Sequence, residues 1–214
     1  MPTPPQRPDL FGQTPWQTVG PFFHYGLPWK GGADLVGASD LGARADLVPE
    51  AHYLLAGPAS RGEIAGEIIE IVGRVTDGAG DPLPDALVEI WQADASGRYN
   101  TDDPEGFIGF GRAATDDDGA YRFRTLKPGP APGPDGRAQA PHIAFGISGR
   151  GLLKRLVTRL YFGGEADNAD DPVLSLVPEP RRQTLMATAV AASAHSWRFD
   201  IVLQGEGETV FFDF

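Results

Sequence analysis

Apolar residues stand at every second position in several segments of this chain. Tyr121, Phe123 and Thr125 alternate with arginines, and the same period of two runs from Trp197 to Leu203. Because successive side chains of a strand point to opposite faces, this period predicts half-buried β-strands. Further strands are expected over residues 68–76, 86–93, 142–147, 156–162 and 209–214. One helix is expected over residues 180–189, with Pro180 in its first turn.

Turn-forming residues separate these strands. The 214 residues include 28 glycines and 20 prolines, and Asp77-Gly78 is a typical turn pair. Short strands joined by such turns, with few helices, indicate an all-β protein. We therefore expect a β-sandwich core, with a barrel as the related architecture, and few short helices.

The first 30 residues differ from the rest. Seven prolines in residues 1–30 predict an irregular N-terminal arm. The same stretch is rich in aromatic residues, which disordered tails usually lack. We expect the arm to pack on its own domain or on a partner, and residues 31–214 to form a single β-sandwich domain.

Charge and composition exclude several classes of protein. A formal net charge of −11 disfavours binding to nucleic acids or to anionic membranes. The absence of cysteine excludes disulfides and thiolate metal sites. No apolar run predicts a secretory leader or a membrane span, so a cytoplasmic protein is expected.

Few residues stand out as carriers of chemistry. His142 begins a predicted strand, and a second histidine two positions later would aim both rings at one metal, but that position is Ala144. Tyr99 could ligate a hard ferric ion as tyrosinate. Arg150 lies between glycines and could present its guanidinium to a carboxylate. Each of these residues is also typical of ordinary packing or of an exposed turn.

A longer pattern of segments resembles the intradiol ring-cleavage dioxygenases. The central segment runs from Val88 to Tyr99 and includes Trp91-Gln92-Ala93-Asp94. The other segments follow in the family's order at residues 71–77, 82–86, 121–130, 140–143, 159–162 and 199–201. Residues 14–22 and 204–214 resemble the subunit of a two-chain family member that does not bind iron.

The resemblance implies an iron site that is incomplete in this chain. The family's catalytic chain holds Fe(III) with two tyrosines and two histidines. Tyr99 and His142 match one of each, whereas the other two positions are Ala131 and Ala144. We therefore expect no metal ligand set and no catalytic residue here. Ferric iron would be held by a partner β chain in an αβ hetero-oligomer that cleaves a small aromatic substrate, a catechol carboxylate, with O₂.

The resemblance also implies a role at the partner's substrate cavity. Thr18, Gly20, Pro21 and Phe22 are expected to line that cavity. Arg150 matches an arginine near the same cavity, where it would attract the substrate carboxylate.

Two alternatives remain open from the sequence. One is an enzyme with its own iron, which would need replacement ligands for Ala131 and Ala144. The other is a non-enzymatic β-sandwich binding module that uses the aromatic arm as a ligand platform.

Overall fold

The computed structural model describes residues 30–37, 39–42, 44, 64–100, 106–133, 136–191, 193 and 195–213. Strands dominate this part of the chain and helices are few and short, so the all-β prediction is confirmed. The strands are β1 Ile68–Thr76, β2 Leu87–Gln92, β3 Phe110–Ala114, β4 Ala120–Leu126, β5 Ala131–Pro132, β6 Ala138–Gln139, β7 His142–Ser148, β8 Leu156–Phe162, β9 Met186–Ala189, β10 Ser196–Arg198 and β11 Ile201–Val202.

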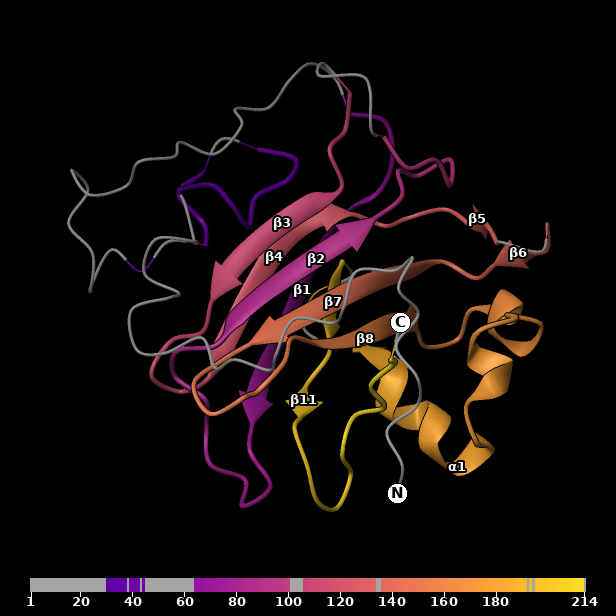
Figure 1. Cartoon of the computed structure of the whole chain (residues 1–214). Helices are drawn as coiled ribbons and strands as arrows, with labels where there is room; N and C mark the ends of the chain where they lie inside the picture. Colours follow the sequence, from indigo (N-terminus) through magenta and orange to yellow (C-terminus); the bar gives the residue numbers. More distant parts are fainter. Residues whose placement is uncertain are drawn as a thin grey trace, which may run out of the picture.

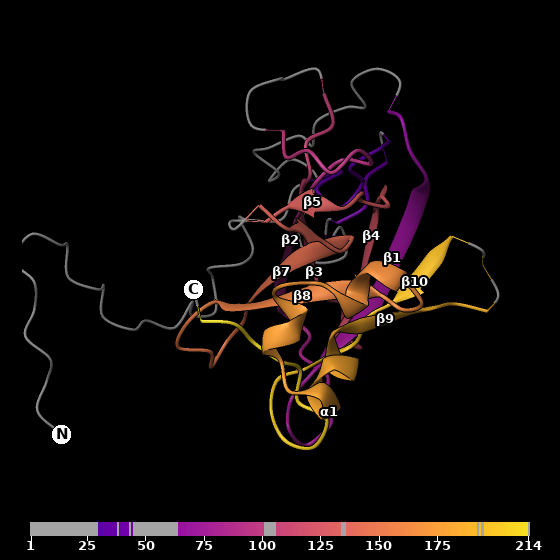
Figure 2. The same ribbon diagram turned by 90° about the vertical axis from the view of Figure 1, so that its right-hand side faces the viewer.

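The strands form two packed layers that meet at one corner. β1 pairs with β4 on one edge and with β10 and β11 on the other, while β2 lies between β3 and β7, followed by β8. β9 pairs with both β8 and β10, so the layers are continuous there (Figures 1 and 2). The result is a sandwich with one closed side.

The core fills the space between the layers. On β7 the inward residues Ile143, Phe145 and Ile147 are fully buried, as the alternation predicts. The Phe145 ring lies 5.2 Å from that of Phe199 and 5.9 Å from that of Tyr121, which belong to the opposite layer. Aromatic contacts across the layers thus hold the sandwich together.

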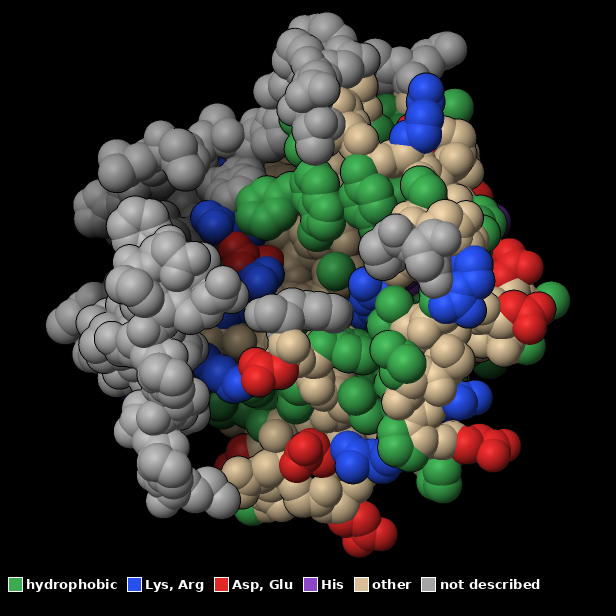
Figure 3. Space-filling model, turned by 45° about the vertical axis from the view of Figure 1, so that its right-hand side comes forward, with side chains coloured by type: hydrophobic (Ala, Val, Ile, Leu, Met, Phe, Trp, Pro, Cys, Tyr) green, Lys and Arg blue, Asp and Glu red, His purple; other side chains and the backbone are tan. Residues whose placement is uncertain are grey.

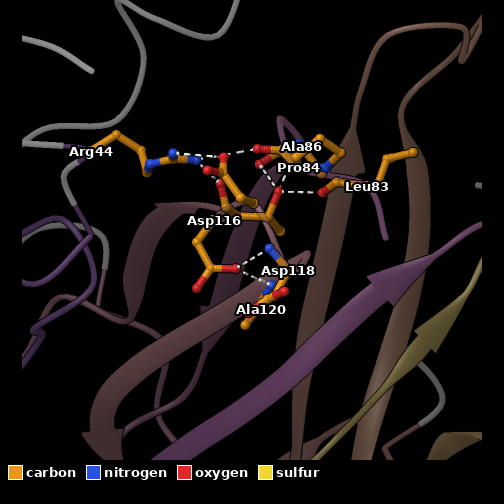
Figure 4. A network of polar contacts seen from close by, with 9 residues as sticks. Arg44, Leu83, Pro84, Ala86, Asp116, Asp118 and Ala120 are labelled. Atoms are coloured by element: carbon orange, nitrogen blue, oxygen red, sulfur yellow. Dashed lines mark hydrogen bonds and ion pairs between the residues drawn. The ribbon is translucent and has the colours of Figure 1, made fainter. Parts of the chain in front are cut away.

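A segment near the N-terminus closes the other side of the sandwich. The N–H of Arg112 on β3 donates to Gly32, and the N–H of Arg124 on β4 donates to Ala33. Arg44 then reaches the turn between β3 and β4, donating 2.8 Å to the Thr115 carbonyl (Figure 4). Edge strands that would otherwise present free backbone groups are therefore covered. The boundary between an arm and a domain at residue 30 stays a prediction, because residues 1–29 lie outside the described part.

The helix predicted over residues 180–189 is wrong in its second half. The α-helix α1 covers only Glu179–Arg182 and is followed by the 3₁₀ turn η5, Gln183–Leu185. Residues Met186–Ala189 form β9, because pairing with β8 and β10 offers them a place in the sheet. Tertiary pairing here overrides local helix propensity.

The C-terminal strand predictions are also corrected. The alternation from Trp197 to Leu203 is divided into β10 and β11, both parallel to β1. Within residues 209–213 the structure shows only an isolated bridge between Phe212 and Val157 instead of a strand.

Short helical turns cover one end of the sandwich beside β8 (Figure 1). They are η3 Ala166–Ala169, η4 Leu174–Leu176, α1 and η5, and they bury Leu174, Val177 and Leu185 against Tyr161. Within the described residues, none of the helices has the length and hydrophobicity to span a membrane.

Candidate functional site

The fold brings Tyr99 and His142 together on the outer face of the layer that contains β2, β3, β7 and β8. Tyr99 follows a tight turn in which the Asp94 carboxylate accepts hydrogen bonds from the N–H groups of Ser96 and Arg98. Gly97 in this turn has φ +81°, and a Cβ there would lie 1.9 Å from the Pro130 carbonyl oxygen. The turn stacks the Tyr99 ring on Trp91, at 5.8 Å between centroids.

The hydrogen bonds of His142 define its protonation. Nδ1 lies 2.8 Å from the Ala140 carbonyl oxygen, which can only accept, so Nδ1 carries the proton. Nε2 then accepts from the Tyr99 hydroxyl at 3.3 Å. Burial lowers the pKa of His142 and outweighs the opposing bond to Ala140, and the Arg159 charge lowers this pKa further. His142 is therefore a neutral imidazole with its Nε2 lone pair directed at Tyr99.

A buried carboxylate supports this arrangement. Asp171 Oδ2 accepts from the Ala140 N–H at 2.8 Å, and Oδ1 accepts from the Tyr161 hydroxyl at 3.1 Å. The same Oδ1 accepts from the Leu174 N–H, which ties the helical turns to the site. Asp171 thus holds the backbone of Ala140, the residue whose carbonyl oxygen accepts from His142.

The two alanine positions lie beside this pair. Ala144 points to the same side of β7 as His142 and its cross-strand partner on β8 is Arg159. Ala131 is buried in β5, and its cross-strand partner on β6 is Gln139. Arg159 Nη1 donates to Gln139 Oε1 at 2.7 Å, so a single hydrogen bond connects the partners of both alanines.

Glu89, Arg112 and Arg155 form an ionic cluster on the same face of the sheet. Glu89 on β2 accepts from Arg112 Nε at 2.7 Å and from Arg155 Nε at 2.9 Å. Gly146 leaves room for this, because a Cβ there would lie 2.0 Å from the Arg155 guanidinium. Figure 3 shows basic and acidic side chains beside a hollow that a row of hydrophobic side chains borders.

Arg150 lies at the far end of β7. It follows Ser148, is half-exposed and pairs with Asp85. Six residue steps at about 3.3 Å each place Ser148 about 20 Å from His142. Arg150 therefore cannot act at the Tyr99–His142 pair of its own chain. Thr18, Gly20, Pro21 and Phe22, the other predicted substrate-binding residues, lie outside the described residues.

Comparison with known proteins gives the family. The family model described as Dioxygenase matches residues 48–205. The protocatechuate 3,4-dioxygenase alpha chain of Pseudomonas putida is 40% identical over 96% of this chain and 98% of its own length. The corresponding alpha chain of Burkholderia cepacia is 42% identical over 94% of this chain and 97% of its own length. This chain belongs to the intradiol dioxygenase family.

A further relative and two solved structures extend the comparison. The beta chain of protocatechuate 3,4-dioxygenase from Burkholderia cepacia is 40% identical over 83% of this chain and 79% of its own length. Among solved structures, a dioxygenase domain from Streptomyces sp. SirexAA-E is 27% identical, with a TM-score of 0.57 over 91% of this chain and 99% of that chain. An intradiol ring-cleavage dioxygenase from Tetranychus urticae, 18% identical with a TM-score of 0.56 over 90% of this chain and 94% of that chain, shows the fold alone.

The residues present do not fit the iron on which the intradiol dioxygenase family depends. Of the four positions that resemble the family's ligand positions, Tyr99 and His142 carry ligand atoms, whereas Ala131 and Ala144 end in methyl groups. The described residues contain no cluster of three or more His, Cys, Asp or Glu side chains that could replace them. One tyrosine and one histidine are too few to retain ferric iron.

Three residues of this site were not predicted from the sequence. Arg159, Gln139 and Asp171 each act through a partner on another strand or turn. The alternation along β8 places Arg159 on the outer face, but only the strand register places it opposite Ala144.

Proposed function

We propose that this chain is the α subunit of a protocatechuate 3,4-dioxygenase, paired with a β chain that holds Fe(III). One observation carries the proposal: the chain matches two α chains over nearly their whole length. The alanines at 131 and 144, two of the four positions that resemble the family's ligand positions, support it. Membership of an enzyme family leaves the binding-module alternative without support.

The proposed reaction cleaves protocatechuate with O₂ to 3-carboxy-cis,cis-muconate. The ring bond between the two hydroxylated carbons breaks, and each of these carbons gains one oxygen atom as it becomes a carboxylate. Both atoms of O₂ enter the product, so no external reductant is needed. Iron held by the partner chain would bind the two catechol oxygen atoms.

This chain's own contribution is substrate binding at the partner's cavity. The Arg150 side chain is half-exposed and lies far from the Tyr99–His142 pair, which suits a role toward another chain. Thr18, Gly20, Pro21 and Phe22 complete the proposed contact. The proposal includes a cytoplasmic location, which the absence of cysteine fits.

The deciding experiment measures iron content and ring cleavage of the full chain, alone and co-expressed with a β chain. We expect iron and activity only in the pair. Stoichiometric iron and protocatechuate cleavage by the chain alone would overturn the assignment and would require other ligands.

A further inference from the structure

A cavity of about 390 Å³ lies at the side of the sandwich that the segment ending at Arg44 covers, and residues of β1, β3, β4 and β10 line it. Its volume suits a small molecule. Among the described residues that line it, arginines outnumber carboxylates by four to one: Arg44, Arg74, Arg122 and Arg198 against Asp116. Because the chain as a whole has a net charge of −11, the fold has gathered positive charge at this place.

Two of these arginines reach the cavity from neighbouring strands. Arg198 on β10 lies beside Val72 of β1, and Arg74 follows two residues further along β1 on the same face. A strand spacing of about 4.8 Å and a rise of about 3.3 Å per residue place the backbones of the two arginines about 8 Å apart. Since both side chains line the cavity, one small ligand can contact both guanidinium groups.

Asp200 positions Arg198 and the backbone beside it. Its Oδ2 accepts from Arg198 Nε at 2.7 Å, and its Oδ1 accepts from the backbone N–H of Arg74 at 3.0 Å. The ion pair uses the Nε of Arg198 and leaves the two terminal nitrogens, which are the edge that binds a carboxylate or phosphate in bidentate fashion. Asp200 therefore orients this arginine without occupying that edge.

The other charged groups of the cavity have partners in the chain. Arg44 donates to the turn between β3 and β4, and Arg122 Nη2 donates to Glu70 at 3.2 Å. The Asp116 carboxylate accepts from two backbone N–H groups of its own turn (Figure 4). In the part of the chain that the structure describes, the terminal nitrogens of Arg74 and Arg198 have no hydrogen-bond partner.

We propose that this cavity binds a small anion with at least two carboxylate or phosphate groups, held by Arg74 and Arg198. A planar guanidinium matches either group, and a second acidic group on the ligand is needed to use both arginines in bidentate fashion. The site goes beyond the proposed function, because the substrate of that reaction has one carboxylate and neither arginine belongs to the proposed substrate contact.

Calorimetric titration of the full chain with citrate and, separately, with pyrophosphate tests this site. We expect at least one of the two anions to bind with one molecule per chain. Binding of citrate alone would assign the site to carboxylates, and binding of pyrophosphate alone would assign it to phosphates. Acetate at the same ionic strength should bind about tenfold more weakly, because it can engage only one guanidinium. Absence of saturable binding for both probes would overturn the proposal.

The variants Arg74→Gln and Arg198→Gln should each weaken this binding about fivefold, as expected for the loss of one exposed ionic contact. Arg74→Gln breaks no side-chain contact with the described residues and should fold like the parent chain. Arg98→Gln is the matched control, because Arg98 is 81% exposed, is paired with Asp94 outside the cavity and carries the same charge. Equal weakening in the control would show that only net charge matters, and would contradict the site.

The same titrations are made with the chain co-expressed and purified with a β chain. Unchanged affinity in the pair supports a ligand site on this chain. Binding by the lone chain that disappears in the pair would mean that the partner covers the cavity, and would overturn the proposal. Because none of these measurements uses ring-cleavage activity or iron, failure of the anion site is distinguishable from failure of the proposed function.

Discussion

Arg150 and Asp85 form an ion pair whose two sides differ in exposure. The Arg150 side chain is 57% exposed and that of Asp85 is 15% exposed, so the guanidinium reaches solvent while the carboxylate stays back. Asp85 already pairs with the Arg150 guanidinium, so a substrate carboxylate would compete with Asp85 for it. In the proposed substrate-binding role, Arg150 would exchange its ion pair with Asp85 for one with the substrate carboxylate.

Replacing Arg150 by alanine should raise the KM of the assembled enzyme for protocatechuate about fivefold. This factor corresponds to about 1 kcal/mol, the free energy that an exposed ion pair contributes. The KM for catechol, which has no carboxylate, should change little. Steady-state kinetics with both substrates measure the difference. Arg122→Ala is the matched control, because Arg122 is 55% exposed and paired with Glu70. Equal KM changes for both substrates would remove the carboxylate role.

Tyr121 is a buried residue whose hydroxyl joins two parts of one layer. It donates to the Phe199 carbonyl, and burial raises its pKa well above 10, so it stays a neutral donor. Tyr121→Phe should lower the free energy of unfolding by about 1–3 kcal/mol, because a buried carbonyl loses its partner. Urea unfolding at neutral pH measures this. Tyr99→Phe, with a longer hydrogen bond of 3.3 Å, should cost less. The reverse order would contradict this account.

Among the elements, residues 31–35 hold the open side of the sandwich together through one buried carboxylate. Asp34 is 2% exposed and accepts from the Ser39 hydroxyl at 2.6 Å, from two backbone N–H groups and from Arg124 at 3.3 Å. Burial raises the pKa of Asp34, but the bonds from Ser39, Arg124 and Val36 together outweigh it and lower the pKa. The charged form is therefore the one that stabilises the fold.

Asp34→Asn should reduce the free energy of unfolding by about 1–2 kcal/mol at pH 7. Because the folded pKa lies below the ordinary value of 3.8, this contribution is complete above pH 3.8 and is lost as the pH falls through the folded pKa. Denaturation curves of both proteins between pH 7 and pH 3 should converge only at the acid end. A difference that is constant with pH would show that the charge is not responsible.

In the whole molecule, the strands at the C-terminal end complete a layer that begins at β1. β10 and β11 are parallel to β1, and Phe199 and Ile201 are buried in the shared core. Parallel pairing of segments so distant in sequence means that this layer cannot form until most of the chain is present.

Deletion of residues 196–214 should therefore abolish the cooperative thermal transition. The loss of two strands leaves one edge of β1 unpaired and removes core side chains. Scanning calorimetry of the full and shortened chains measures this. Asp213→Ala removes only an exposed ion pair with Lys154 and should leave the melting temperature nearly unchanged. A shortened chain that melts cooperatively would contradict the prediction.

The local patterns of the sequence determined several strands and the family of this protein. Alternation predicted β1 and the inward face of β7, because the side-chain period of a strand depends only on its own residues. The segments around Trp91 indicated the family by resemblance, and the residues at 99, 131, 142 and 144 predicted an incomplete iron site. Neither inference required the tertiary structure.

The tertiary structure decided which segments became partners. It made Met186–Ala189 a strand between β8 and β10, and it divided the alternation after Trp197 into two strands along β1. It also placed Arg159 opposite Ala144 and Gln139 opposite Ala131. Strand register depends on contacts between residues far apart in the chain, and no local period encodes them.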